Sequence, residues 1–267
     1  MDQKNTAQAF EALHHGPEIL ILPNAWDAAS AALMADAGAK AVATSSAAVA
    51  WAHGYPDGDA LPMEKVITTV AEIARVTDLP VTCDFEGGYT DDLEVLADNI
   101  VRVIEAGAVG VNLEDGGRDP ELHARKIAAA RAAAERAGVP LFINARTDVY
   151  LRGLAEGEAA FAETVRRAAL YAEAGASGIF TPGAKDEGLI GRLAEAIRLP
   201  LNIMLLPGLP PAARLRALGV RRLSSATAPF RLAYASLAKG VAAYLQTGEA
   251  GAFASEALPN LNQRFSA

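Results

Sequence analysis

Cysteine is almost absent from this chain, because Cys83 is the single one among 267 residues. One cysteine excludes an intramolecular disulfide, and this fits a reducing compartment. The first residues are polar and carry no apolar core of a signal peptide. We therefore expect a cytoplasmic protein.

Long apolar and long basic runs are missing as well. No uninterrupted apolar stretch reaches the ~20 residues that a membrane helix needs, so we expect no membrane partner. Lys and Arg number 24 against 32 Asp and Glu, and the net charge of −8 disfavours nucleic acid as a partner. A locally basic pocket could still hold a small anionic substrate.

Several familiar motifs do not occur. No two histidines have the spacing of a zinc site, and no lysine ends a predicted strand as a Schiff-base aldolase would require. No nucleotide-binding glycine motif and no Gly/Ser-rich or Pro-rich linker is present. The length is near the ~250 residues of a (β/α)8 barrel, so we expect one domain over residues 1–267.

Short apolar runs alternate with Ala-rich helical patterns along the chain. The predicted strands cover 19–23, 40–45, 80–85, 108–113, 140–145, 177–181, 200–206 and 220–225. The predicted helices cover 26–37, 62–77, 92–106, 121–137, 157–174, 185–197 and 229–246. This alternation indicates a parallel sheet, and eight βα units favour an α/β fold of the TIM-barrel type.

The segment from about 229 to 267 exceeds what a barrel needs. A helix follows the last strand, and a second helix is predicted to start near Gly248. Phe253, Leu258, Leu261 and Phe265 have no obvious partner within the chain. We therefore expect this extension to pack against another subunit.

Carboxylates follow two neighbouring strands. Asp84 and Glu86 are two residues apart, so along a strand they share a face with Thr82, and Glu114 follows Asn112 in the same way. Buried carboxylates are costly unless they are paired or bound to a cation, and oxygen ligands suit a hard divalent ion. The alternative for each of these acids, Glu86 included, is that it caps the following helix.

Other polar residues end the remaining strands. Arg146 follows Asn144 and could bind a carboxylate or phosphoryl group, or form a structural ion pair. Asn202 could contact a substrate or fill a barrel layer. The small residues 44–48 could let backbone N–H groups approach an anion, or simply pack closely. Cys83 alternates with Asp84, which predicts a core position facing the helices and no nucleophilic role.

These residues stand in motifs that resemble the phosphoenolpyruvate mutase/isocitrate lyase superfamily, in particular its small bacterial members. The resemblance covers nearly the whole chain. The motifs are Pro23-Asn24-Ala25-Trp26-Asp27-Ala28, Ala43-Thr44-Ser45-Ser46, Gly54-Tyr55-Pro56-Asp57-Gly58, Cys83-Asp84-Phe85-Glu86-Gly87-Gly88-Tyr89, Val111-Asn112-Leu113-Glu114-Asp115 and Asn144-Ala145-Arg146-Thr147-Asp148.

The resemblance implies a barrel whose last helix is swapped between subunits of a homodimer or homotetramer. It implies Mg²⁺ (or Mn²⁺) held largely through water, and a 2-oxo acid or its enolate that chelates this metal. The implied metal residues are Asp84, Glu86 and Glu114, and the implied substrate carboxylate meets the backbone amides of Ser45, Ser46 and Ala47. Arg146 would neutralise charge, and Asp57 would lie near the reacting end of the substrate.

Two departures from the family pattern limit what the resemblance implies. The chain has Asp84-Phe85-Glu86 where the family usually has Asp-x-Asp, and its loop 115–123 contains neither the lyase cysteine nor the phosphonomutase lysine. We expect a Mg²⁺-dependent lyase that cleaves a C–C bond or decarboxylates by way of a pyruvate-enolate-like intermediate. The alternatives are an enzyme acting on a P–C bond, of the phosphonomutase or phosphonopyruvate hydrolase type, and a non-catalytic protein that binds 2-oxo acids.

Overall fold

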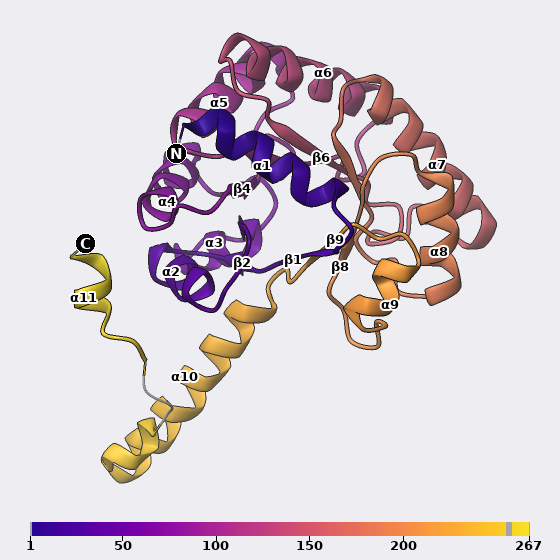
Figure 1. The fold of residues 1–267 in the computed structure, drawn as a ribbon. Helices are drawn as coiled ribbons and strands as arrows, with labels where there is room; N and C mark the ends of the chain where they lie inside the picture. Colours follow the sequence, from indigo (N-terminus) through magenta and orange to yellow (C-terminus); the bar gives the residue numbers. More distant parts are fainter. Residues whose placement is uncertain (1, 255–257, 267) are drawn as a thin grey trace.

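The computed structural model describes residues 2–254 and 258–266 and contains a barrel of parallel strands surrounded by helices (Figure 1). The strands are β1 (Leu20–Leu22), β2 (Asn24–Ala25), β3 (Val42–Thr44), β4 (Val81–Asp84), β5 (Gly110–Glu114), β6 (Phe142–Arg146), β7 (Gly178–Phe180), β8 (Leu201–Met204) and β9 (Arg222–Ser224). Each predicted strand region overlaps one of them. β5 and β6 each run one residue beyond their predicted ranges, and the first range contains β1 but not β2.

The split at Pro23 explains how the barrel closes. β1 pairs with β9, and β2 pairs with β3, so two halves of one extended segment join the two ends of the sheet. Proline has no N–H to donate, but the Pro23 carbonyl accepts a hydrogen bond from the Ala43 amide. The predicted TIM barrel is therefore confirmed.

Helices follow nearly every strand. They are α1 (Gln3–His15), α2 (Ala28–Asp36), α3 (Ser46–Ala52), α4 (Met63–Arg75), α5 (Leu93–Glu105), α6 (Pro120–Arg136), α7 (Gly157–Glu173), α8 (Glu187–Ala196), α9 (Ala212–Ala217), α10 (Ala228–Thr247), the 3-10 helix η1 (Ala250–Phe253) and α11 (Leu261–Phe265). The short helices α3 and α9 lie in segments where no helix was predicted. No helix among the described residues is both long and apolar enough to span a bilayer.

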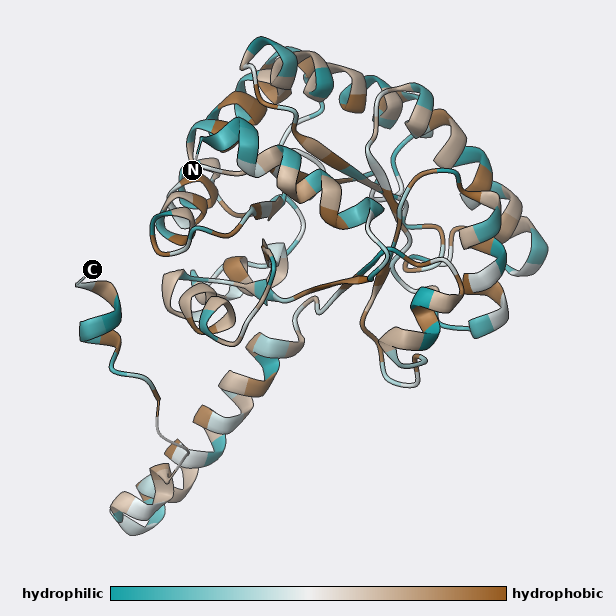
Figure 2. Cartoon of the chain, viewed as in Figure 1, coloured by the Kyte–Doolittle hydropathy of each residue, from teal (hydrophilic) through white to brown (hydrophobic). Residues whose placement is uncertain are grey.

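Side chains alternate along the strands between the barrel interior and the helix layer. Val111 and Leu113 of β5 belong to the same apolar cluster as Ile100 of α5 and Ile127 of α6. Cys83 lies in that cluster too, as its position relative to Asp84 predicted. Figure 2 shows the result, with mostly apolar strands inside and polar patches on the outer helices.

Helix α1 closes the amino-terminal end of the barrel. The Phe10 ring packs edge-on against Phe142 of β6 at 5.5 Å between centroids, and the His14 ring stacks on Phe142 at 3.9 Å. Gly110 makes this approach possible, because a Cβ at that position would lie 2.8 Å from the Phe10 ring. The opposite end, where the strands end, is left for polar groups.

The C-terminal extension differs from the prediction. No continuous helix starts near Gly248: η1 packs on α10, with the Phe253 ring 5.2 Å from that of Tyr244. α11 returns to its own barrel, where the Arg264 guanidinium donates to Asp36 and to the Val76 carbonyl. Phe253 and Arg264 therefore have partners within the chain, which the sequence, with no obvious partner for this segment, did not predict. Residues 255–257 of this extension lie outside the described part.

Helix α10 contacts the barrel at its first turn, where the Phe230 ring packs edge-on against Trp26 at 5.3 Å, and contacts η1 near its end. It projects away from the barrel (Figure 1), and its residues Leu232, Leu237 and Leu245 are 72%, 54% and 78% exposed. Beyond its first turn, the helix that would complete the last βα unit therefore does not lie on its own barrel.

Candidate active site

The carboxyl ends of the strands surround a cavity of about 230 Å³. Its polar lining is formed by Asn24, Ser45, Ser46, Asp57, Asp84, Asn112, Arg146, Ser224 and Thr227, and its apolar lining by Ala47, Trp51, Leu151, Phe180, Met204 and Ala226. The structure thus brings together six of the residues predicted for the site. Glu114 borders the cavity through Arg146, whereas Glu86 and Asn202 do not line it.

Asp84 is the last residue of β4, and each of its carboxylate oxygens is held. Oδ2 accepts hydrogen bonds from the Ser46 amide at 2.9 Å and the Ser46 hydroxyl at 2.8 Å. Oδ1 accepts one from Asn112 Nδ2 at 3.2 Å. Three of its roughly four acceptor sites are thus used, and the remaining one is on Oδ1.

The start of α3 supplies the predicted backbone amides, but two of them already have acceptors. The Ser45 amide donates to the Ala25 carbonyl at 3.2 Å, and the Ser46 amide donates to Asp84. Ala47 is the second residue of α3, so its N–H has no acceptor within the helix. A substrate carboxylate at this place would meet Ala47 first.

Glu86 lies beyond the end of β4, so the strand alternation that predicted its direction does not apply. Its φ angle is 47°, and its carboxylate accepts hydrogen bonds from the Tyr89 hydroxyl at 3.0 Å and from the Asp59 amide. The prediction that it shares the face of Asp84 was wrong for this reason. Burial raises the pKa of Glu86 to about 7, and the nearby Asp57 and Asp59 carboxylates add to the rise.

Glu114 ends β5 beside Arg146 of β6, with which it is in register. The Arg146 Nη1 atom lies 2.6 Å from Glu114 Oε2. Burial nevertheless raises the pKa of Glu114 to about 8, and the Asp148 and Asp84 carboxylates raise it further while Arg146 opposes them. One guanidinium does not balance the negative charge gathered here.

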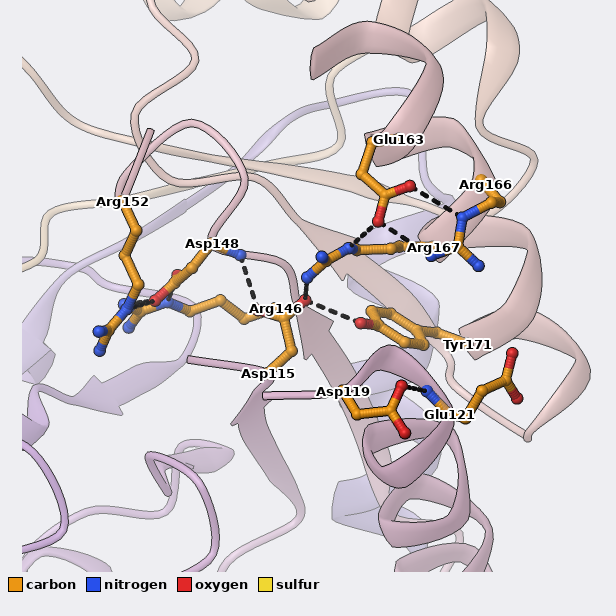
Figure 3. Close-up of polar contacts among 10 residues, drawn as sticks. All are labelled: Asp115, Asp119, Glu121, Arg146, Asp148, Arg152, Glu163, Arg166, Arg167 and Tyr171. Carbon is orange, nitrogen blue, oxygen red and sulfur yellow. Dashed lines mark hydrogen bonds and ion pairs between the residues drawn. The ribbon is translucent and has the colours of Figure 1, made fainter. Parts of the chain in front are cut away.

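Arg146 forms ion pairs with two carboxylates, those of Glu114 and Asp148. Its pair with Asp148 is bidentate, with Nε 2.6 Å from Oδ1 and Nη2 3.1 Å from Oδ2 (Figure 3). The structural ion pair considered from the sequence therefore exists, although Arg146 still lines the cavity. Asp148 appeared in the sequence only as part of a motif. Its spacing of two residues from Arg146 is the signal that could have indicated the Arg146–Asp148 ion pair.

Asp115 occupies the opposite side of the end of β5. Its carboxylate accepts from the Asp148 amide at 2.9 Å, Arg167 at 2.8 Å and Tyr171 at 2.7 Å (Figure 3). Burial alone would raise its pKa, but these three donors lower it below the usual value. Asp115 thereby joins β5 and α7 to the segment that carries Asp148, a role that the sequence did not reveal.

Asp57 reaches the cavity from the segment between α3 and α4. Its pKa is raised by burial and by the charge of Asp84. A cavity-lining carboxyl with a raised pKa is better suited than an ordinary aspartate to hold or move a proton.

Asn202 lies deeper in the barrel. Its side chain is 1% exposed, and its Oδ1 accepts from the Ser224 hydroxyl at 3.3 Å. Of the two alternatives considered for it, a position in a barrel layer is the one that this structure shows.

The acids fit a hydrated divalent cation better than a bare one. No three His, Cys, Asp or Glu side chains among residues 2–254 and 258–266 gather closely enough to hold a metal by themselves. Mg²⁺ usually takes one or two carboxylates and keeps several waters. Burial is the main cause of the raised pKa values of Glu86 and Glu114, and neighbouring carboxylates add to them, so a bound cation would favour the ionised forms of these acids.

The loop after β5 is tied down by ion pairs. Arg118 Nη2 lies 2.9 Å from Asp59 Oδ2, and Arg118 Nε lies 2.9 Å from Asp91 Oδ1. Asp59 in turn accepts from the Gly87 and Tyr89 amides. The short loop therefore connects the Glu86 segment to α6.

The chain is similar to several known proteins over most of its length. A crystal structure of a candidate phosphonomutase from Burkholderia cenocepacia is 43% identical, with a TM-score of 0.86, and the match covers 89% of this chain and 99% of that one. An uncharacterised Mycobacterium tuberculosis protein is 35% identical over 227 residues, or 83% of each chain. The 2-methylisocitrate lyase of Bacillus subtilis is 27% identical over 208 residues, which are 74% of this chain and 67% of the lyase.

The family comparison agrees with the motifs. Residues 10–245 match the family described as phosphoenolpyruvate phosphomutase, a span that includes every predicted site residue. The chain therefore belongs to the phosphoenolpyruvate phosphomutase family, within the phosphoenolpyruvate mutase/isocitrate lyase superfamily.

Proposed function

We propose that this enzyme is a Mg²⁺- or Mn²⁺-dependent lyase that cleaves a C–C bond of a small 2-oxo acid or its precursor, or decarboxylates it, through a pyruvate-enolate-like intermediate. The observation that carries the proposal is the buried negative charge at the carboxyl ends of the strands. Asp57, Asp84 and Glu114 lie in or beside one cavity in which Arg146 supplies the positive charge. An anionic substrate needs a further cation to bind there.

Each part of the cavity has a proposed task. Asp84 and Glu114, with Glu86 nearby, hold the cation, which supplies electrophilic stabilisation of the negative charge that develops on the substrate. Arg146 neutralises part of that charge, and the raised pKa of Asp57 suits it to hold a proton at the reacting end. Ser45, Ser46 and Ala47 border the substrate carboxylate.

We propose that the apolar lining reduces the access of water to the reacting atoms. Trp51, Leu151, Phe180 and Met204 come from four different segments and cover one part of the cavity wall. A drier cavity strengthens the electrostatic contacts inside it and protects a reactive intermediate from hydrolysis.

A panel of substrates with Mg²⁺ tests this function. The panel contains a 2-oxo dicarboxylic acid, a methyl-substituted hydroxy tricarboxylic acid and a phosphonopyruvate, and pyruvate, CO₂ and phosphate are measured. We expect pyruvate from a C–C substrate, with no phosphate, and loss of turnover in Asp57→Asn. Phosphate release would instead establish cleavage of a P–C bond, an alternative that the similarity to the 43% identical candidate phosphonomutase supports. Oxalate binding without turnover of any substrate would establish a 2-oxo acid binding protein.

We also propose that the enzyme is a homodimer or homotetramer in the cytoplasm, with α10 of one subunit on the barrel of its partner. An apolar groove of about 670 Å³ lies between α1, β1 and α2, lined among others by Leu13, Ile21 and Met34. Ile21 is 60% exposed although it lies in a barrel strand. This is where the barrel lacks a covering helix, and α10 has the matching apolar face.

Light scattering tests the assembly. Leu237→Asp on α10 is expected to yield monomers, because a charge would be buried at the contact. The control Leu258→Asp lies in the extension outside α10, where Leu258 is 68% exposed, and it should leave the assembly intact. A monomeric wild-type protein would contradict the proposal.

A further inference from the structure

Arg222 is an unusual residue for the interior of a barrel. It lies in β9, its side chain is completely buried, and its Nη2 donates to Asn112 Oδ1 at 3.1 Å. β9 and β5 are not neighbours in the sheet, so this hydrogen bond crosses the barrel. Among the described residues, Arg222 Nε and Nη1 have no hydrogen-bond acceptor.

The hydrogen bonds of Asn112 determine how its amide is turned. Oδ1 accepts from Arg222 and also from Asn144 Nδ2 at 2.9 Å. If the amide were turned over, its NH₂ group would face these two donors and its oxygen would face the Asp84 carboxylate. The orientation with Nδ2 toward Asp84 Oδ1, at 3.2 Å, is therefore strongly preferred.

We propose that Arg222 is a positioning residue, which acts through Asn112 to fix the Asp84 carboxylate for the cation and 2-oxo acid site. The inference rests on the proposed function for the identity of the ligand. Its structural part, the dependence of Asn112 and Asp84 on Arg222, stands on the hydrogen bonds alone.

The energetics favour a functional reason for this arginine. A buried guanidinium with two unpaired nitrogens is costly, and an apolar residue of similar size often gives an equally stable or more stable protein. Burial lowers the pKa of Arg222 to about 9, while Asp84 opposes the shift, so the side chain stays charged at neutral pH. The barrel thus keeps a charge that its packing does not require.

The direction in which the cation affinity changes when Arg222 is neutralised separates a positioning role from a purely electrostatic one. A positive charge near a cation site repels the cation, so its removal should strengthen cation binding by Coulomb's law. Loss of the orientation of Asp84 should weaken binding. Weaker binding after neutralisation of Arg222 therefore cannot be an effect of its charge.

Mn²⁺ affinity, measured by electron paramagnetic resonance on the intact protein, tests the proposal with Arg222→Met, Asn112→Leu and the double variant. Each single variant is expected to weaken Mn²⁺ binding by about 10–100-fold, the range typical for partners of metal ligands. The double variant should bind no more weakly than Asn112→Leu, because the two residues act in series. The control Thr82→Val removes another buried, unpartnered polar atom of the interior and should leave the affinity unchanged.

Unchanged or tighter Mn²⁺ binding in a folded Arg222→Met protein, or losses that multiply in the double variant, would overturn the proposal. If Arg222→Met does not fold, Arg222→Gln, which is too short to reach Asn112, takes its place with the same expected loss. If the wild-type protein binds no Mn²⁺, the proposed function fails, and metal-free crystal structures still decide the inference. A turned Asn112 amide or a displaced Asp84 carboxylate in the variant would support it, and an unchanged pair would overturn it.

Discussion

Glu114 and Asp115 are consecutive buried carboxylates whose pKa values are shifted in opposite directions. Asp115 faces away from the barrel mouth and accepts hydrogen bonds from three donors, which lower its pKa. Glu114 faces the mouth, shares Arg146 with Asp148, and has a pKa raised by burial to about 8. A carboxylate saturated with donors holds the structure together, whereas one with too few is suited to bind a cation.

Asp148 connects the two regions. Its backbone amide donates to Asp115, and its carboxylate holds the guanidinium that Glu114 shares. The structural region therefore sets the geometry of the region that binds ligand. Substitutions in the two regions should therefore differ in whether they lower the stability of the protein or its affinity for ligand.

The largest expected effect is that of Asp115→Ala on stability. Arg167 would keep only Glu163 as its partner, while the Tyr171 hydroxyl and the Asp148 amide would lose their buried acceptor, and such a loss typically costs about 3–5 kcal/mol. Urea unfolding of the metal-free protein measures the loss. Glu114→Gln, one residue away and nearly isosteric, should change the unfolding free energy by less than about 1 kcal/mol. Equal losses in the two variants would remove the distinction.

The next effect concerns His123, whose ring packs edge-on against Tyr171 at 4.6 Å on the Asp115 side. Burial lowers its pKa from 6.5 to about 4, so between these values the unfolded chain binds the proton and the folded one does not. Stability should therefore fall as the pH falls from 6.5 to 4, by about 3 kcal/mol for this group. In His123→Phe this share of the pH dependence should disappear, and an unaltered profile in urea titrations would argue against a neutral buried histidine.

Arg146→Lys should affect binding more than stability. The lysine keeps the charge but cannot form the bidentate contacts with Asp148 or with a substrate carboxylate. Oxalate, which resembles the enolate of pyruvate, should bind about tenfold more weakly, as expected when one charged hydrogen bond of about 1.5 kcal/mol is lost. Calorimetric titration measures this, and an unchanged affinity would return Arg146 to a purely structural role.

The smallest effect is expected from Cys83→Ala. The thiol is buried among apolar residues, and burial raises its pKa to about 12. The substitution should cost about 1 kcal/mol of stability through lost packing and leave turnover unchanged. A folded variant without turnover would show that Cys83 takes part in the reaction.

Much of this architecture follows from the sequence. Strand alternation correctly placed Asp84, Asn112 and Arg146 toward the interior and Cys83 toward the helices, because those residues lie inside regular strands. It failed for Glu86, because β4 ends at Asp84 and the next residues turn with a positive φ at Glu86. Alternation says nothing about direction once the strand has ended.

The alternation of side chains along strands could not predict hydrogen-bond partners that are distant in sequence. The bonds of Asp115 to Arg167 and Tyr171 join residues more than 50 positions apart, and Arg222 reaches Asn112 across 110 positions. The sequence showed no obvious partner for the apolar residues of the extension, but the structure packs Phe253 against Tyr244, returns α11 to its own barrel and leaves Leu232, Leu237 and Leu245 of α10 exposed. Such outcomes depend on how the elements meet in space.

The central claim is that the acids at the carboxyl ends of the strands bind a small 2-oxo acid by way of a divalent cation. Calorimetric titration of oxalate into the wild-type protein, with Mg²⁺ and with EDTA, tests it most directly, and Asp84→Asn serves as the matched variant. We predict binding with Mg²⁺, none with EDTA, and a large loss of affinity in Asp84→Asn that leaves the melting temperature of the metal-free protein nearly unchanged. Equal binding of oxalate with Mg²⁺ and with EDTA would contradict the account.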